Sequence, residues 1–175
     1  MANFLINGGK PLKGVVKVSG SKNAALPILA ATLLTDKKCV IKNVPNIKDV
    51  HTMIEILRSL GAEVSFKRGV ATVHVKKINN TKLPERLACE LRASILVWGP
   101  LLARAGKMES SYPGGCVLGR RPIDTHVQAL QKLGVKFLVG RVGVRAAVKK
   151  LKGEKFTLNE FSVTGTENVV MAAVL

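Results

Sequence analysis

The sequence predicts a mixed α/β (α+β) fold, built from repeated α/β units in which apolar helices lie inside the domain. Three observations predict it: a repeat of matching positions, a helix in each copy that is apolar on nearly every side, and a closing hairpin in which apolar and polar residues alternate. Hydrophobic residues make up 47% of the 175 residues and aromatic residues only 4%. We therefore expect an aliphatic core of the size of one domain.

The repeat rests on three pairs of matching positions, each 73 residues apart. The pairs are Pro27 and Pro100, Gly61 and Gly134, and Val75-Lys76-Lys77 and Val148-Lys149-Lys150. A third copy begins where residues 165–175 match residues 20–30 at an offset of 145, close to twice 73. An apolar helix that ends at Leu175 without a polar cap or glycine is unusual, so we expect the chain to be part of a longer protein.

The elements of the first copy follow in order. Residues 23–34 are predicted to form the apolar helix, 39–47 a short strand or loop, and 49–60 an amphipathic helix. Gly61 follows this helix at the position of a left-handed cap. Residues 62–75 alternate around Arg68-Gly69, which predicts a hairpin with a two-residue turn.

The second copy repeats the same order of elements. Residues 92–104 are predicted to form the apolar helix, 108–123 a strand or loop, and 124–133 an amphipathic helix. The amphipathic helix places apolar side chains three residues apart on one face, at Val127, Leu130 and Leu133.

The charge of the chain predicts an anionic partner. The formal net charge is +17, from 28 Lys and Arg against 11 Asp and Glu, which suits phosphorylated small molecules, nucleic acid or an acidic surface. Nucleic-acid binding is disfavoured as the primary function, because the basic residues are scattered singly or in pairs, with no zinc finger or aromatic RNA-binding signature. The apolar stretches 24–34 and 93–103 are too short to span a membrane, and no signal peptide is evident, so we expect a cytoplasmic protein.

The chain has three cysteines, Cys39, Cys89 and Cys116. The odd number argues against a disulfide framework, and no Cys-x-x-Cys or His/Cys pairing indicates a metal site. Cys39 lies in an expected strand and Cys89 in an expected helix, and both are interpreted as small core hydrophobes.

Cys116 differs, because its neighbours describe a loop. In SYPGGCVLGRRPIDTH (111–126), glycines on both sides of the cysteine would allow the loop to close over a ligand. Arg120 and Arg121 would favour the thiolate. From the residues alone Cys116 is either an exposed bystander or a nucleophile or acid. A hydrolase that pairs it with His126 is weakly supported, since nothing marks an oxyanion hole.

Four stretches carry a resemblance to a known family: SGSKNAALPILAATLL (19–34), LRASILVWGPLLAR (91–104), PGGCVLGRRPIDTHVQALQKLG (113–134) and SVTGTENVVMAAVL (162–175). They resemble the N-terminal half of the UDP-N-acetylglucosamine 1-carboxyvinyltransferases, over about residues 6–175. The cysteine loop with its Arg-Pro-x-Asp is the specific part of the resemblance. The sister family, the 3-phosphoshikimate 1-carboxyvinyltransferases, shares the fold but lacks this loop.

The resemblance implies the enolpyruvyl-transferase fold, with two domains of three α/β units each. Residues 1–21 would form an N-terminal strand that packs with a second domain, absent here, and residues 22–175 an incomplete first domain. The implied reaction transfers the enolpyruvyl group of phosphoenolpyruvate to the 3′-hydroxyl of UDP-N-acetylglucosamine and releases phosphate, the first committed step of peptidoglycan synthesis. No metal or cofactor is implied, and we expect these 175 residues alone to be inactive.

The resemblance also implies the residues that act on phosphoenolpyruvate. Cys116 matches the family's catalytic proton donor, which can form an adduct with phosphoenolpyruvate and is alkylated by fosfomycin. Lys22, Asn23 and Arg121 match its phosphoenolpyruvate-binding residues. A helix N-terminus beside Lys22 favours anions, although Ser21 or Asn23 could simply cap that helix. The planar fork of Arg121 suits a phosphate or carboxylate.

A second set of residues matches the family's UDP-N-acetylglucosamine site. Its members are Arg92, Arg121, Pro122, Ile123, Asp124, Thr125, Ser162 and Val163, the last two placed before the third apolar helix. By default a lone arginine such as Arg92 is a surface charge, and Asp124 could instead N-cap the helix that follows. Glu160 departs from the family, whose members often carry a basic residue there.

Two other functions stay open at this point. One is an enzyme like the 3-phosphoshikimate 1-carboxyvinyltransferases. The other is a non-enzymatic module that binds anions or nucleic acid, which the charge of +17 favours.

Overall fold

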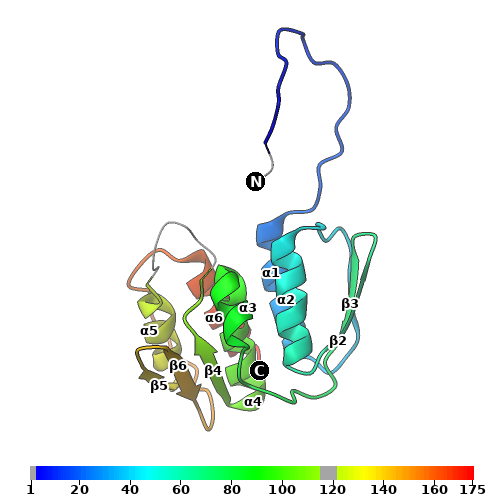
Figure 1. The fold of residues 1–175 in the computed structure, drawn as a ribbon. Coiled ribbons are helices and arrows are strands. Elements are labelled where there is room, and N and C mark those ends of the chain that lie inside the picture. The colour runs from blue at the N-terminus through cyan, green and yellow to red at the C-terminus, as the bar shows by residue number, and fades with distance from the viewer. Residues whose placement is uncertain (1–2, 115–121) are drawn as a thin grey trace.

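A computed structural model describes residues 3–114 and 122–175, which form two α/β units and a further helix (Figure 1). The first unit contains α1 (Lys22–Ala31), the 3₁₀ helix η1 (Thr32–Leu34), β1 (Cys39–Ile41), α2 (Lys48–Ser59), β2 (Glu63–Lys67) and β3 (Val70–His74). The second contains α3 (Glu85–Glu90), the 3₁₀ helix η2 (Arg92–Val97), α4 (Trp98–Ala105), β4 (Lys107–Ser111), α5 (Asp124–Lys132), β5 (Lys136–Val139) and β6 (Gly143–Ala147). α6 (Val163–Ala173) follows them.

The two units share one topology, so the predicted repeat is confirmed in three dimensions. Their antiparallel sheets have the orders β1-β3-β2 and β4-β6-β5. A long-range backbone bond recurs at the predicted offset of 73: the N–H of Asn79 donates to the carbonyl of Leu60 at 3.0 Å, and the N–H of Lys152 to that of Leu133 at 3.0 Å. Most helices lie between the two sheets in Figure 1.

The predicted glycine caps of both units and the turn of the first unit are also confirmed. Gly61 follows α2 with φ of 107° and Gly134 follows α5 with φ of 90°, the left-handed conformation that ends a helix. Arg68 and Gly69 join β2 to β3 with φ of 47° and 74°. Two positive φ values in a two-residue loop match the twist of the flanking strands.

The second apolar helix differs from its prediction. Residues 92–104 form η2 followed by α4, rather than one continuous α-helix. Pro100 is the third residue of α4, where a proline is tolerated because the N–H groups of a first turn have no partner within the helix. The same missing N–H leaves the carbonyl of Leu96 without an α-helical bond, which favours the tighter 3₁₀ form upstream.

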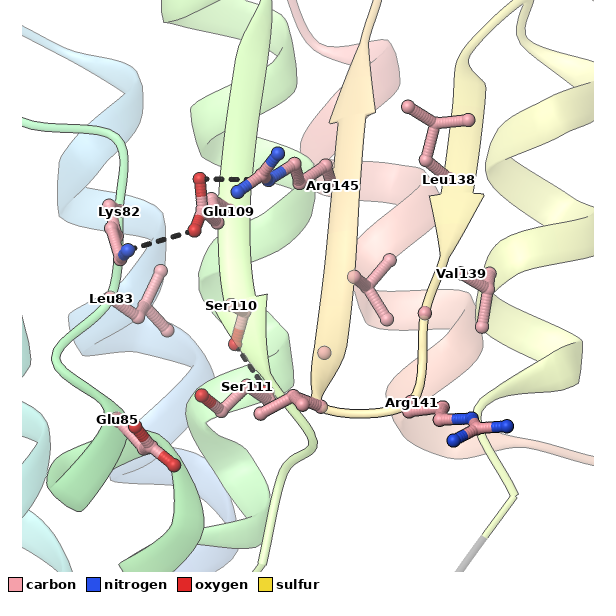
Figure 2. Close-up of a pocket in the computed structure, with 14 residues that line it drawn as sticks. Lys82, Leu83, Glu85, Glu109, Ser110, Ser111, Leu138, Val139, Arg141 and Arg145 are labelled. Atoms are coloured by element: carbon pink, nitrogen blue, oxygen red, sulfur yellow. Dashed lines mark hydrogen bonds and ion pairs between the residues drawn. The ribbon is translucent and has the colours of Figure 1, made fainter.

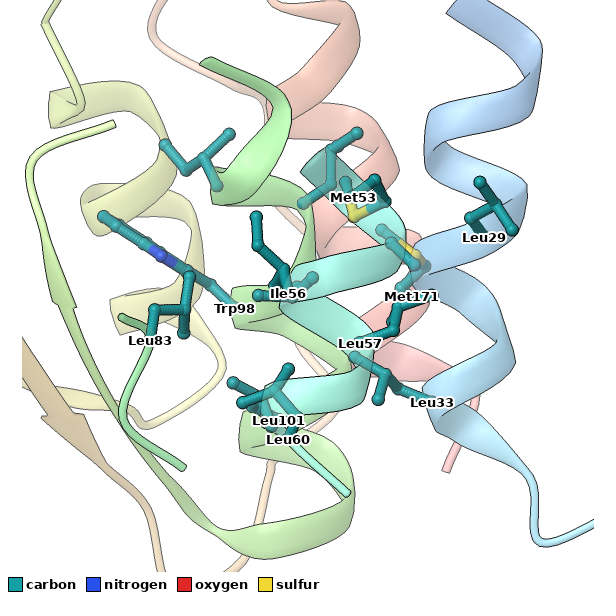
Figure 3. Close-up of a cluster of buried hydrophobic side chains, with 14 of the residues drawn as sticks. Leu29, Leu33, Met53, Ile56, Leu57, Leu60, Leu83, Trp98, Leu101 and Met171 are labelled. Carbon is teal, nitrogen blue, oxygen red and sulfur yellow. The ribbon is translucent and has the colours of Figure 1, made fainter. Parts of the chain in front are cut away.

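The core lies between the helices and is largely aliphatic, as predicted (Figure 3). Its largest fully buried side chains include Leu29 and Leu33 of the first apolar segment, Met53 and Leu57 of α2, and Trp98 at the start of α4. α1 buries four residues but leaves Ile28 on its exposed side. Burial of this aliphatic surface is the main stabilising contribution to the fold.

The interpretation of Cys39 and Cys89 as core residues is wrong, since neither belongs to the buried core. Cys39 is half-buried in β1, whereas Cys89 is exposed. α3 is only six residues long, and its buried side consists of Leu87 and Ala88, so Cys89 points away from the core.

Residues 3–20 form neither helix nor strand and extend away from the two units (Figure 1). Their apolar side chains are exposed: Phe4 and Leu5 are each 93% exposed, and Val15 is fully exposed. The packing of residues 1–21 against a second domain, and the boundary at residue 22, stay predictions. Within 3–114 and 122–175, no helix is long and apolar enough to cross a membrane.

Candidate anion-binding site

α1, α2, α5 and α6 begin at the same end of the molecule, the upper end in Figure 1. Lys22 and Asn23 are the first two residues of α1. Ser21 is the N-cap, and its Oγ accepts the N–H of Ala24 at 3.4 Å. Ser21 therefore fills the capping role that the sequence left open between Ser21 and Asn23, and the N-terminus of α1 carries the added charge of Lys22.

The Lys22 charge is paired with an acidic residue of the neighbouring helix. Its Nζ lies 3.0 Å from Oδ2 of Asp49, the second residue of α2. Both side chains are partly exposed, so the pair is open to solvent and to an incoming anion.

Arg92 holds the predicted UDP-sugar segment instead of lying as a free surface charge. Its Nη2 donates to the carbonyl of Pro122 at 2.7 Å. Arg92 opens η2, and η2 packs against both α1 and α6. Arg92 is therefore not the lone surface charge of the default interpretation, and it links the start of η2 to the residues just before α5.

The run from Pro122 to Thr125 forms the entry to α5. Ile123 is the N-cap residue, without a side-chain capping bond, and Asp124 is the first residue of the helix. The alternative N-capping role of Asp124 is therefore wrong, although its carboxylate in the first turn still stabilises the helix dipole. Oγ1 of Thr125 donates to Oε2 of Glu160 at 3.4 Å. Glu160, the residue at which the sequence departs from the family, therefore faces this run.

Ser162 and Val163 form the start of α6. Ser162 is the N-cap, and its Oγ accepts the N–H of Gly165 at 3.0 Å. Val163 is the first residue of the helix and is 72% exposed, so the placement of both residues before the helix holds only for Ser162. A Cβ built on Gly165 would lie 3.5 Å from Cγ2 of Thr125, which shows that the first turns of α5 and α6 are in close contact.

A pocket of about 550 Å³ opens beside this helix start. Its lining is mostly apolar but includes Glu160, Ser162 and Glu167, and burial raises the pKa of the Glu167 carboxyl. The lining residues are Phe156, Thr157, Leu158, Glu160, Phe161, Ser162, Val163, Thr166 and Glu167.

The predicted residues fall into three groups. Arg92, Pro122–Thr125 and Ser162–Val163 are brought together by direct contacts between η2, α5 and α6. Lys22 and Asn23 lie at the same end of the molecule on α1, which packs against η2. Cys116, Arg120 and Arg121 lie outside the described residues.

A second pocket, of about 480 Å³, lies at β4 and β6 and contains none of the predicted residues (Figure 2). Glu109 is its central charge, with Lys82 Nζ at 2.9 Å and Arg145 Nε at 3.1 Å. The hydrogen bond from Lys82, with the charge of Arg145, keeps the pKa of Glu109 below its usual range. These charges satisfy one another, so this pocket is less suited to an anion than the helix N-termini.

One buried residue of this region, His126, was considered only as the partner of Cys116 in a hydrolase and was not among the predicted site residues. Burial, and then the charge of Arg92, lowers the pKa of His126 to about 4. Both ring nitrogens are engaged, by Asn168 and Thr164, so His126 offers no free base for a cysteine hydrolase. A weak signal was present in the sequence: Asn168 is a polar residue directly before the apolar run 169–173 of α6. No group of three His, Cys, Asp or Glu side chains in the described part of the chain could hold a metal.

Curated proteins with similar sequences are named for one activity. "UDP-N-acetylglucosamine 1-carboxyvinyltransferase" of Methylacidiphilum infernorum is 48% identical over 99% of this chain, and "UDP-N-acetylglucosamine 1-carboxyvinyltransferase 2" of Carboxydothermus hydrogenoformans is 46% identical over 100% of it. The chain spans 42% of the length of each relative.

Solved structures share the fold at lower identity. The enolpyruvyl transferase NikO of Streptomyces tendae has a TM-score of 0.71 at 24% identity, covering 82% of this chain and 32% of that protein. An EPSP synthase of Acinetobacter baumannii has a TM-score of 0.73 at 18% identity, and the match covers 94% of this chain and 39% of that protein. The sequence profile of the family described as EPSP synthase (3-phosphoshikimate 1-carboxyvinyltransferase) matches residues 6–175. Since this match covers nearly the whole chain, the chain belongs to the EPSP synthase family and has its enolpyruvyl-transferase fold.

Proposed function

We propose that this chain forms part of an enzyme that transfers the enolpyruvyl group of phosphoenolpyruvate to the 3′-hydroxyl of UDP-N-acetylglucosamine and releases phosphate. One observation carries the proposal: four curated relatives named for this activity are 44–48% identical over 95–100% of the chain. The likeness to EPSP synthases is 18–19% in sequence and concerns the fold. The UDP-sugar is therefore favoured over 3-phosphoshikimate as the acceptor.

The geometry supports two anionic substrates. α1, α5 and α6 begin at one end of the molecule, where their unpaired N–H groups and partial positive charges favour phosphate groups. In the proposed site Lys22 and Asn23 bind phosphoenolpyruvate, and the UDP-sugar lies along Arg92 and the starts of α5 and α6. Arg121 is proposed to contact both substrates.

The chemistry requires one proton at carbon and the loss of phosphate. Addition joins the 3′-oxygen of the sugar to C2 of the enolpyruvyl group while C3 gains a proton, for which Cys116 is the proposed donor. Elimination then removes a proton from C3, breaks the bond between C2 and the phosphate oxygen, and restores the double bond. The net reaction exchanges the hydroxyl proton of the sugar for the enolpyruvyl group, with no redox change.

This proposal also gives roles to two further features. The exposed apolar side chains of residues 3–20 would pack against a second domain that carries the rest of the site. An enzyme of this type would act in peptidoglycan synthesis, and Cys116 would be the residue that fosfomycin alkylates.

The test is a chimera in which residues 1–175 replace the matching part of the Methylacidiphilum infernorum relative. We expect phosphate release that requires both phosphoenolpyruvate and UDP-N-acetylglucosamine. Fosfomycin should inactivate the chimera, and the Cys116→Ser variant should resist this modification. The 175-residue chain assayed by itself should bind UDP-N-acetylglucosamine without turnover.

Three results would contradict the proposal. A folded chimera that uses 3-phosphoshikimate and ignores the UDP-sugar would place the chain in the sister activity. Turnover by the 175 residues alone would show that the site is complete without further residues. Steeply salt-dependent DNA binding without UDP-sugar affinity would favour a nucleic-acid-binding module.

A further inference from the structure

A buried polar network joins η2, α4, α5 and α6 beside the residues of the proposed UDP-sugar site. Its centre is Asn168 on α6, which is 0% exposed, and His126 on α5, which is 3% exposed. Asn168 contacts the backbone at Gly99 and Ile95 as well as the imidazole of His126. Thr164, in the first turn of α6, completes the network at the other ring nitrogen.

The hydrogen-bond directions in this network follow from one fixed donor. The N–H of Gly99 can only donate, so the atom it meets at 2.8 Å is the amide oxygen of Asn168. The amide nitrogen therefore faces the carbonyl of Ile95 at 2.8 Å and Nδ1 of His126 at 3.0 Å. Since that nitrogen donates, Nδ1 of His126 must accept, and the imidazole carries its proton on Nε2.

This assignment makes the bond between His126 and Thr164 directional. Nε2 of His126 donates to Oγ1 of Thr164 across 3.2 Å. A proton on Nδ1 would face the amide N–H of Asn168 and break the network. The neutral imidazole with its proton on Nε2 is thus the form that satisfies every partner.

The position of Asn168 leaves little freedom for this arrangement. α4 and α6 approach so closely at Gly99 that an added Cβ would collide with the backbone oxygen of Asn168 and lie 2.9 Å from its Oδ1. Asn168 is therefore fixed by the backbone of the second unit, and it fixes the orientation of the His126 ring in turn.

The network connects the two elements on which the proposed UDP-sugar residues lie. His126 is the third residue of α5, directly after Asp124 and Thr125. Thr164 is the second residue of α6, directly after Ser162 and Val163. The bond between His126 and Thr164 is thus a direct side-chain connection between the first turns of both helices.

We propose that His126 is a positioning residue of the UDP-sugar site, which holds the first turns of α5 and α6 in register through Thr164 and Asn168 without touching the substrate. This inference rests on the proposed function. This role differs from a purely structural one, because it predicts that loss of the connection changes the KM for UDP-N-acetylglucosamine selectively. The phosphoenolpyruvate residues Lys22 and Asn23 lie on α1, outside the connection.

The test compares Thr164→Val with Thr164→Ser in the chimera. Valine keeps the volume and removes the acceptor for His126, whereas serine keeps the hydroxyl. We expect Thr164→Val to raise the KM for UDP-N-acetylglucosamine about fivefold, the effect of one lost hydrogen bond, with kcat and the KM for phosphoenolpyruvate within about twofold of the parent. Thr164→Ser should restore the parent KM.

A second variant tests the partner. His126→Asn keeps an acceptor near the Nδ1 position but loses the donor to Thr164, so it should raise the same KM. The double variant with Thr164→Val should then add nothing further, since both changes break one connection. Nitrogen-15 NMR of the 175-residue chain should show the imidazole proton on Nε2.

The outcomes separate the two proposals. A parent chimera that does not bind or use UDP-N-acetylglucosamine overturns both the proposed function and this inference. An active parent with an unchanged KM in Thr164→Val overturns the inference alone. Equal losses in kcat, both KM values and melting temperature also overturn it, because they indicate a structural role only.

Discussion

At the start of α1, Lys22 forms an ion pair with Asp49. The positive charge of Lys22 is the one that we propose binds phosphoenolpyruvate. Lys22 and Asp49 lie 3.0 Å apart, with side chains 50% and 37% exposed. Exposed pairs contribute little to stability, since solvent screens the attraction and ordering long side chains costs entropy. We therefore expect this pair to contribute little to folding, so the proposed ligand-binding role of Lys22 can be tested apart from stability.

Replacing Lys22 should separate these two roles. We expect Lys22→Met to change the free energy of unfolding by less than about 1 kcal/mol in urea denaturation, while calorimetric titration of the chimera shows loss of phosphoenolpyruvate binding. Lys37→Met is the matched control, because Lys37 pairs with Asp36 at 3.7 Å beyond the other end of α1. A large loss of stability in Lys22→Met alone would contradict the functional assignment.

Glu160 gives a second prediction at the scale of one residue. Its carboxylate lies 3.4 Å from Oγ1 of Thr125 and so places negative charge beside the proposed diphosphate position. Glu160→Lys replaces repulsion with attraction, and we expect it to tighten UDP-N-acetylglucosamine binding roughly tenfold at low salt, with a smaller gain in 0.5 M salt. The affinity of Glu160→Gln for UDP-N-acetylglucosamine should lie between those of the parent and of Glu160→Lys.

The control for this effect is Glu154→Lys, which makes the same charge change at an exposed residue outside the pocket beside α6. An equal gain from Glu154→Lys would show that overall charge, not the position of Glu160, controls affinity. Titration calorimetry of the chimera and both variants at two salt concentrations decides between these results.

At the scale of elements, the contact of α4 with α6 depends on the absence of a side chain at Gly99. We expect Gly99→Ala to lower the free energy of unfolding by about 2–3 kcal/mol, because its Cβ would force the two helices apart at Asn168. Gly153→Ala is the control, since a Cβ at Gly153 meets no atom within 4 Å. Equal stability of the two variants in urea would contradict this account of the packing.

The same scale shows what could be predicted from the sequence. The β2–β3 hairpin was predictable because alternation and the Arg68-Gly69 turn are local properties of the chain. The caps at Gly61 and Gly134 were predictable for the same reason. The division of the second apolar helix was missed, although Pro100 marked the place where α-helical bonding is interrupted.

The candidate site divides in a similar way. Lys22, Arg92 and Ser162 were identified because the resemblance marked their positions. The network of His126 and Asn168 was not, since the chain separates these residues by 42 positions and only the packing of α5 on α6 brings them together. Asn168, a polar residue directly before the apolar run 169–173 of α6, was a weak signal, and it did not identify the partner.

At the scale of the molecule, one arginine connects the two units. The guanidinium of Arg104, at the end of α4, donates to the carbonyls of four residues of the first unit and the segment after it: Leu33 at 3.0 Å, Thr35 at 2.9 Å, Val75 at 2.7 Å and Lys76 at 3.1 Å. Only a planar fork with several N–H groups can serve two chain segments in this way.

Removal of this fork should therefore destabilise the whole chain. We expect Arg104→Met to lower the free energy of unfolding by about 2–3 kcal/mol, because partly buried carbonyls lose their donors. Arg104→Lys should restore only part of this loss. Arg145→Met is the control, because the Arg145 side chain is 70% exposed and forms a surface ion pair with Glu109. Comparable losses in the two methionine variants, measured by urea denaturation, would contradict a special role for Arg104.

The buried imidazole makes the stability of the whole molecule depend on pH. The pKa of His126 is lowered to about 4 by burial and by Arg92, against 6.5 in the unfolded chain. As the pH falls, the unfolded chain therefore takes up the proton first, and stability that is present above pH 6.5 is lost progressively towards pH 4. Between pH 7 and pH 5 we expect a loss of about 2 kcal/mol from this residue.

The measurement is the free energy of unfolding in urea at pH 7, 6 and 5, for the parent chain and for His126→Asn. Asparagine does not titrate, so the variant should be less stable at pH 7 but should lose less stability on acidification. The carboxyls of Glu90 and Glu109 have lowered pKa values and lose their contribution below their usual range near pH 4.5, outside this window. Parallel curves for parent and variant would therefore show that His126 is accessible to protons in the folded chain, and that its ring is not locked between Asn168 and Thr164.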